Sequence, residues 1–276
     1  MHRKVEPPVS PWAHASQHGI MGQPTREVRG DAVEIIVAQD YEEMGLLAAR
    51  EIARLLDKQP EAAVVVATGA TPLGTYRELA ALHRRDRLDA SRLRVFQLDA
   101  YVGVSPDDRR SLYRWLAEIF LKPLGVGDEQ VVRLPGDAPD PEAVCREYDA
   151  AVEEAGGFDL AVLGLGPNGH LGFNEPPADP RSPTRVVSLT EESIASNAAY
   201  WGARVDVPPL AMTAGMRPLL MARRTLLLVS GAHKHDILHR TVEGVPTADV
   251  PASYLHQAAN VTIFADDAAW TGGDGG

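Results

Sequence analysis

The sequence predicts an α/β fold built on a parallel, doubly wound sheet. Its short apolar runs, such as VEIIVA, AVVVA and DLAVL, are nearly continuous instead of alternating, which is typical of strands covered on both faces. Segments with helical periodicity separate these runs along the whole chain. With 276 residues, 45% of them hydrophobic and 24% charged, the chain is long enough to bury a large core and is not generally disordered.

The elements follow from these runs in chain order. VEIIVA is the first strand, and a segment with helical periodicity follows it. AVVVA is the second strand, and the next helix is expected to begin at Pro72. Proline suits the first turn of a helix because the N–H group that it lacks would have no partner there. The expected strands are 33–38, 63–67, 93–98, 159–163, 225–229 and 261–265. The expected helices are 41–56, 72–83, 111–121, 141–154 and 234–242.

Both ends of the chain differ in composition from the rest. Residues 1–30 are rich in Pro, His, Ser, Gln and Arg, and residues 271–276 read TGGDGG. We expect two flexible tails. Between them, residues 31–270 form a single domain.

Charge and composition exclude several classes of function. The 38 acidic and 27 basic residues give a net charge of −11, which disfavours nucleic acid and anionic membranes as partners. No apolar run reaches the roughly 18 residues of a membrane span, and the N-terminus lacks the apolar segment of a secretion signal, so we expect a cytoplasmic protein. The single cysteine, Cys145, permits neither an internal disulfide nor a cysteine-rich metal cluster.

Ligands of doubly wound sheets bind at the carboxyl ends of the strands, and four such ends carry chemistry. After AVVVA, the small residues Thr68, Gly69, Ala70 and Thr71 leave backbone N–H groups free to approach an anion at a helix start. This pattern favours a phosphate cradle, with an ordinary turn capped by threonine as the alternative.

The other three strand ends carry titratable groups. Asp99 ends a buried strand, where burial can raise the pKa of a carboxylate so that it acts as a base. His170 lies in GPNGHLGFNEP with Glu175 five residues later, which suits proton transfer by an oriented imidazole. Lys234 begins a helix, where a bound anion would offset the unfavourable dipole. In the alternative, non-catalytic interpretation, Asp99 caps a neighbouring turn, His170 packs structurally in its loop and Lys234 is a solvated surface residue.

At these residues the chain resembles the glucosamine-6-phosphate deaminase/isomerase family, which shares its fold with 6-phosphogluconolactonases. The resemblance rests on ATGATPLGTY, LDAYVGV, LGLGPNGHLGFNEP, SPTRVVSLT, SGAHK and PASYLHQAANVTIF, and it covers roughly residues 33–268. It implies a Rossmann-like three-layer α/β/α sandwich with a mostly parallel sheet. It also implies a small sugar phosphate as substrate and no metal or organic cofactor.

The resemblance assigns roles to individual residues. Asp99 would move a proton between C2 and C1 of the opened sugar, His170 would open the ring, and Glu175 would orient that histidine. Asn168 belongs to the same catalytic segment, at a position where many members carry Asp. Thr68, Gly69, Ala70, Thr71 and Lys234 would bind the phosphate. The implied reaction is ring opening, enolisation and loss of ammonia to give fructose 6-phosphate.

Three positions depart from the family pattern. Ala100 replaces a glutamate, Ala70 replaces a glycine, and Ala199 stands where the family has a phosphate-binding arginine, with Arg204 nearby as a candidate substitute. If Ala100 and Ala199 enlarge the site and remove charge, the same pocket could eliminate the C3 hydroxyl of N-acetylglucosamine 6-phosphate or a related amino sugar phosphate. A 6-phosphogluconolactonase and a non-catalytic sugar-phosphate sensor are weaker alternatives. The resemblance leaves a homo-oligomer open.

Overall fold

The computed structural model describes residues 26–29 and 33–273, and its centre is an eight-stranded sheet. Seven of the strands run parallel, and β1 joins the edge antiparallel to β2. In spatial order the strands are β1 (Arg26–Arg29), β2 (Val33–Ala38), β11 (Val261–Asp266), β10 (Thr225–Val229), β7 (Leu160–Gly164), β3 (Ala63–Val66), β4 (Arg94–Gln97) and β6 (Val131–Val132).

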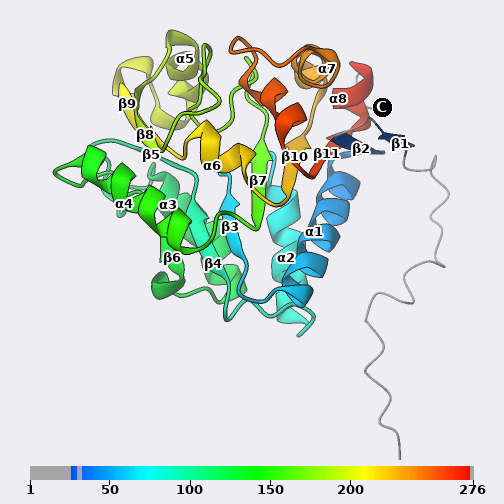
Figure 1. Ribbon diagram of the computed structural model, residues 1–276, viewed down its shortest axis with the longest axis horizontal. Coiled ribbons are helices and arrows are strands. Elements are labelled where there is room, and N and C mark those ends of the chain that lie inside the picture. The colour runs from blue at the N-terminus through cyan, green and yellow to red at the C-terminus, as the bar shows by residue number, and fades with distance from the viewer. Residues whose placement is uncertain (1–25, 30–32, 274–276) are drawn as a thin grey trace, which may run out of the picture.

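Helices cover both faces of this sheet, so the three-layer α/β/α architecture is confirmed (Figure 1). One face packs against α1 (Tyr41–Lys58), α2 (Leu73–Arg84), α3 (Leu112–Leu116) and the π-helical turn Ala117–Leu121. The other packs against α4 (Pro141–Glu154), α6 (Met216–Leu220), α7 (His235–Glu243) and α8 (Asp267–Thr271). Short 3-10 turns lie at Lys122–Leu124, Asp128–Gln130, Arg204–Asp206, Ala232–Lys234 and Pro251–Gln257.

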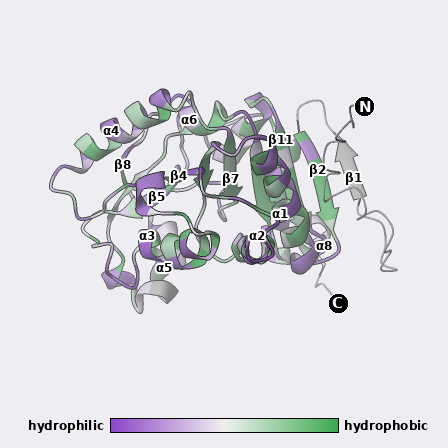
Figure 2. Cartoon of the chain, turned by 90° about the horizontal axis from the view of Figure 1, so that it is seen from below, coloured by the Kyte–Doolittle hydropathy of each residue, from purple (hydrophilic) through white to green (hydrophobic). Residues whose placement is uncertain are grey.

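The layers follow directly from the strand sequences. In β3, Val64 and Val66 belong to the apolar cluster under α1 and α2, whereas Val65 belongs to the cluster on the opposite face, because successive side chains of a strand alternate. All three side chains are buried. In Figure 2, α4 and α6 lie on one side of the sheet and α2 and α3 on the other.

A second, smaller antiparallel sheet lies beyond the carboxyl end of β4. It contains β5 (Asp99–Tyr101), β9 (Leu210–Thr213) and β8 (Arg185–Ser188), in that order. Together with α5 (Glu191–Trp201) it encloses its own apolar cluster, which includes Tyr101, Phe173 and Trp201. Figure 1 shows α5 next to this small sheet at one side of the molecule. None of the three short strands was expected from the sequence.

The expected tails need correction at their inner ends. Residues 26–29, which the composition placed in the N-terminal tail, form β1, because their backbone pairs with β2 in the register Arg26↔Val37. Thr271, placed in the C-terminal tail, is the last residue of α8, whose first turn is capped by the Asp266 side chain. Residues 1–25 and 274–276 lie outside the described part of the chain. Within that part, no helix has the length and apolarity needed to cross a membrane.

Candidate active site

Four adjacent strands of the large sheet place the four sequence segments side by side. Along the sheet the order is β10, β7, β3 and β4, so the loops that follow these strands are neighbours at one edge. Between β3 and β7 the chain changes its direction of travel across the sheet, and such switch points are where open α/β sheets bind ligands. The loops carrying Lys234, His170, Thr68–Thr71 and Asp99 therefore meet at the expected binding edge.

The loop after β3 presents free backbone donors. Gly69 has φ +102, and in the described chain the amides of Gly69, Ala70 and Thr71 donate no hydrogen bond. Pro72 follows and α2 begins at Leu73, so these donors lie at a helix N-terminus, where the dipole favours an anion. The methyl group of Ala70 is exposed, so replacing glycine there does not fill a buried space.

Tyr41, at the start of α1, holds this loop in place. Its hydroxyl donates to the Ala70 carbonyl at 3.0 Å and accepts from the Gly74 amide at 2.8 Å. This role could not be predicted from the sequence, because Tyr41 is 29 residues away from Ala70. The contact fixes the loop while leaving the amides of residues 69–71 free.

We expect Tyr41→Phe to lower the stability of the protein by about 1–2 kcal/mol, since the Gly74 amide loses its partner. Phosphate affinity should fall severalfold because the loop is no longer fixed. Thermal unfolding and titration with inorganic phosphate measure the two effects. An unchanged phosphate affinity would show that the loop does not depend on this hydroxyl.

Lys234 supplies a positive charge without a carboxylate partner. It ends the 3-10 turn after β10, and in the described chain no acidic side chain lies within 4 Å of its ammonium group. Burial lowers its pKa. Lys234 also contributes to the lowered pKa of His170, so the two side chains are close enough to interact electrostatically. A partly buried, unpaired ammonium group at this edge suits an anionic substrate.

Asp99 is the first residue of β5 and is buried. Its Oδ1 has no hydrogen-bond partner, and burial raises the pKa of the carboxyl to about 7. The His170 loop passes directly over it: a Cβ atom built on Gly172 would lie 3.5 Å from Asp99 Oδ2 and 2.8 Å from Thr213 Oγ1. A buried carboxyl group with a pKa near neutrality can both accept and return a proton.

His170 lies 3.9 Å from Glu175, measured from Nδ1 to Oε1. Burial lowers the pKa of the imidazole to about 4; Glu175 opposes the shift and Lys234 adds to it. The ring is therefore neutral at physiological pH. Glu175 accepts hydrogen bonds from the Thr190 amide at 2.9 Å, from the Thr190 hydroxyl at 2.8 Å and from the Ser193 hydroxyl. These bonds attach Glu175 to the first turn of α5 and fix it beside the histidine.

Comparison with known proteins agrees with this geometry. The family described as glucosamine-6-phosphate isomerases/6-phosphogluconolactonase matches residues 39–264. The chain belongs to this family. A protein of Thermoanaerobacter pseudethanolicus named glucosamine-6-phosphate deaminase is 37% identical over 86% of this chain and 94% of its own length. One of Cutibacterium acnes with the same name is 40% identical over 86% of this chain and 91% of its own length.

Solved structures also resemble this chain. A monomeric glucosamine-6-phosphate deaminase is 37% identical, with a TM-score of 0.84 over 86% of this chain and 98% of that protein. The 6-phosphogluconolactonase of Trypanosoma brucei is 20% identical, with a TM-score of 0.68 over 85% of this chain and 96% of that protein, and it shares the fold.

Within this family site, Asn168 contacts both the loop that carries His170 and helix α5. Its Oδ1 accepts from the His170 amide at 3.2 Å, and its Nδ2 donates to Glu192 of α5 at 3.2 Å. These contacts shape the loop and connect it to α5. Both polar atoms of the Asn168 side chain are used away from the imidazole, so we assign it a positioning role.

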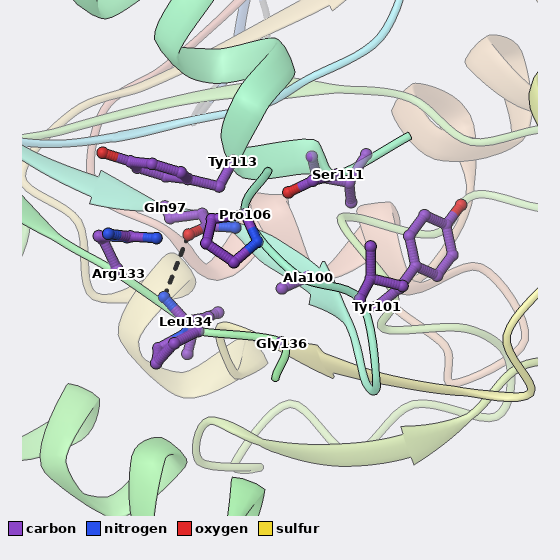
Figure 3. Close-up of a pocket in the computed structure, with 12 residues that line it drawn as sticks. Gln97, Ala100, Tyr101, Pro106, Ser111, Tyr113, Arg133, Leu134 and Gly136 are labelled. Atoms are coloured by element: carbon purple, nitrogen blue, oxygen red, sulfur yellow. Dashed lines mark hydrogen bonds between the residues drawn. The ribbon is translucent and has the colours of Figure 1, made fainter. Parts of the chain in front are cut away.

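Ala100 does not enlarge the Asp99 side of the site, which corrects the sequence expectation. Because strand side chains alternate, it points away from the face that Asp99 occupies. It lines a small cavity together with Ser111, Arg133 and Leu134 (Figure 3). Gln97 crosses this cavity, donating to the Asp99 carbonyl at 2.8 Å and accepting from the Leu134 amide at 3.1 Å, and thereby fixes the backbone of Asp99.

Arg185 is a candidate that the residue-by-residue prediction missed. In the small sheet Asp99 and Arg185 both pair with Thr213, so the three side chains share one face. The guanidinium group donates to Asn174 Oδ1 at 2.7 Å, has no carboxylate within 4 Å in the described chain, and has a pKa lowered by burial. The stretch SPTRVVSLT, already noted for the resemblance, contained this signal.

Ala199 occupies the position at which the resemblance leads one to expect a phosphate-binding arginine. Ala199 lies in α5, but its side chain falls outside the described part of the chain. Arg204 is exposed and pairs with Glu191 at 2.6 Å. Its role as a substitute for the arginine stays a prediction. Among the described residues no group of three or more His, Cys, Asp or Glu side chains could hold a metal ion. That the reaction needs no metal or cofactor stays a prediction.

We expect Glu175→Gln to lower kcat by about 10- to 100-fold. The amide carries no charge to favour the protonated imidazole, so the already low pKa of His170 should fall further. Steady-state kinetics with the sugar phosphate measures the loss. Glu147→Gln, an exposed glutamate of α4 on another part of the molecule, is the control. A full rate in Glu175→Gln would remove this carboxylate from the catalytic set.

Proposed function

We propose that this chain is a glucosamine-6-phosphate deaminase that converts glucosamine 6-phosphate and water into fructose 6-phosphate and ammonia. The observation that carries the proposal is Asp99: a buried carboxyl group with a pKa of about 7 lies beneath the His170 loop, beside an anion cradle. The family membership and the names of relatives 35–40% identical support the substrate.

The phosphate binds at one end of this site. The free amides of residues 69–71 donate to its oxygens, and Lys234 balances its charge. This fixes the sugar relative to Asp99, because the loops after β3 and β4 extend from adjacent strands. Arg185 faces the same side of the small sheet as Asp99, and its guanidinium group, which Asn174 and Ser182 hold through one nitrogen, would bind an oxygen of the sugar.

The chemistry then follows in three steps. Neutral His170, oriented by Glu175, takes the proton of the C1 hydroxyl and returns it to the ring oxygen, which opens the ring. Asp99 removes the proton from C2 and delivers it to C1, while the C1 oxygen gains a proton and the nitrogen loses one, so that the amino aldehyde becomes its isomer, a C2 imine. Water adds to C2 and ammonia leaves, so atoms balance and the net reaction is a hydrolysis.

The dehydration alternative lacks support. It relied on Ala100 and Ala199 enlarging the site, but Ala100 faces the opposite side of its strand from Asp99. Solved lactonase structures, such as those at 20% and 17% identity, resemble this chain in fold alone. The expectation of a cytoplasmic enzyme stays a prediction.

A substrate panel tests the proposal. The protein should release ammonia from glucosamine 6-phosphate, and it should neither release ammonia nor remove water from N-acetylglucosamine 6-phosphate. Hydrolysis of 6-phosphogluconolactone should not exceed the spontaneous rate. Ammonia and product mass are followed together. A product of the N-acetylated sugar that is lighter by one water would overturn the proposal, as would rapid lactone hydrolysis without ammonia release in the panel.

A further inference from the structure

Outside the active site, Asp266 is a buried carboxylate at the end of β11. It has an unusual number of partners: Oδ1 accepts from the amides of Gly231 at 3.0 Å and Ala269 at 2.8 Å, and Oδ2 accepts from the Ser230 hydroxyl and from the Gly231 amide at 3.1 Å. The Ala269 bond caps α8. The other bonds reach the neighbouring strand end, in the turn that leads to Lys234.

Gly231 connects Asp266 to Lys234. Its amide is held by Asp266, and its carbonyl accepts from the Lys234 amide at 2.9 Å. Gly231 has φ +92, a conformation that L-residues rarely adopt, so the backbone turns sharply here. The orientation of the turn, and with it the direction in which Lys234 extends, therefore depends on the Asp266 carboxylate.

A second attachment lies directly after Lys234. His235 Nδ1 and His239 Nε2 both lie 3.0 Å from the Trp270 carbonyl of α8, and the two imidazole rings contact each other at an interplanar angle of 56°, with centroids 4.5 Å apart. A carbonyl can only accept, so both nitrogens donate. Lys234 thus lies between two points, Gly231 and His235, that are each fixed to the segment 266–272 (the C-terminal clamp).

We propose that Asp266, acting through the C-terminal clamp, is a positioning residue that directs Lys234 toward the substrate phosphate. This rests on the proposed function, in which Lys234 binds that phosphate. Asp266 does not touch the substrate, and it fixes the backbone that carries the lysine. Loss of its bonds to Ser230 and Gly231 should weaken ground-state binding of the phosphate more than it slows proton transfer at Asp99.

Asp266→Ser separates this role from the capping of α8. Serine is a good N-cap for the Ala269 amide, but its shorter side chain cannot also hold Gly231. We expect KM for glucosamine 6-phosphate to rise about tenfold, which corresponds to the loss of one charge-assisted hydrogen bond between Lys234 and the phosphate. The kcat should stay within about twofold of the parent value. Asp267→Asn is the matched control: Asp267 is exposed, lies in the same helix turn and does not contact the turn at 230–234.

A double-mutant cycle with Lys234→Ala shows whether the effect passes through the lysine. In the Lys234→Ala background Asp266→Ser should have no further effect on the binding of inorganic phosphate, measured by calorimetry without turnover. An equal loss in both backgrounds would overturn the positioning role. Asp266→Glu keeps the carboxylate, and a parent-like KM in this variant would support the positioning role. Thermal unfolding confirms that each variant is folded.

The calorimetry also separates the two proposals. If Lys234→Ala binds inorganic phosphate as tightly as the parent protein, the phosphate role of Lys234 is wrong and the proposed function loses that part. If Lys234→Ala weakens binding but Asp266→Ser does not, only the clamp is wrong.

Discussion

Asp99→Asn is expected to lower kcat about a thousandfold, because an amide cannot carry the proton from C2 to C1. Asparagine is nearly the same size, and Gly172 would still pass over it. KM should therefore change little. Steady-state kinetics gives both values, with Asp57→Asn, an exposed carboxylate of α1, as the control. A variant that keeps one tenth of the parent kcat would contradict proton transfer by Asp99.

The same substitution should stabilise the protein above neutral pH. Burial raises the pKa of Asp99 to about 7, so the folded protein holds this proton more tightly than the unfolded chain does. The resulting stabilisation is complete below about pH 4 and is lost as the pH rises through about 7. At pH 8 the parent protein carries a buried charge that Asp99→Asn lacks, and we expect the variant to be about 2 kcal/mol more stable.

Two measurements check this pH dependence. Thermal unfolding at pH 5 and pH 8 should show that the advantage of Asp99→Asn grows with pH. In the parent enzyme kcat/KM should rise with pH through about 7, as Asp99 becomes the base, and His170, with its pKa of about 4, stays neutral throughout. A flat profile between pH 6 and pH 8 would assign this carboxyl group another role.

Lys234→Ala is expected to raise KM for glucosamine 6-phosphate about 100-fold, with a smaller change in kcat. The ammonium group is partly buried and unpaired in the described chain, so its attraction for phosphate is less screened than at the surface. For glucosamine without the phosphate the variant and the parent should be equally poor. Lys122→Ala, an exposed lysine, is the control. A small KM effect would place the phosphate elsewhere.

Six of the eight strands of the large sheet could be predicted because they are continuous apolar runs, whereas the edge strands β1 and β6 were not expected. Strands 33–38 and 225–229 and helix 141–154 have the predicted bounds. Other elements differ by one or two residues, as with α1, which continues to Lys58, and Pro72, which precedes α2. The expected helix 111–121 is one short α-helix continued by a π-helical turn.

The small sheet could not be predicted in the same way. Strands β5, β8 and β9 have three or four residues each, and polar residues begin or end them. Asp99 and Thr213 pair across more than a hundred residues, so no local pattern announces the contact. Without that pairing the sequence could not show that Ala100 faces away from Asp99 or that Arg185 shares its face.

The candidate site was largely predictable because each group follows a strand of the large sheet. Asp99, His170, Glu175, Lys234 and residues 68–71 all lie at that edge. The groups that hold them, such as Tyr41, Gln97 and Asp266, act over long sequence distances through hydrogen bonds that only the folded backbone creates. Their side chains carried no catalytic pattern of their own.

The most direct test of the central claim uses glucosamine 6-phosphate that carries deuterium at C2. If Asp99 moves this proton, the enzyme should form ammonia and fructose 6-phosphate in equal amounts. The deuterium should leave C2 and divide between C1 of the product and the solvent, and Asp99→Asn should suppress both the label transfer and the ammonia. Ammonia released together with an aldose product that keeps deuterium at C2, or fructose 6-phosphate formed equally fast by Asp99→Asn, would contradict the account.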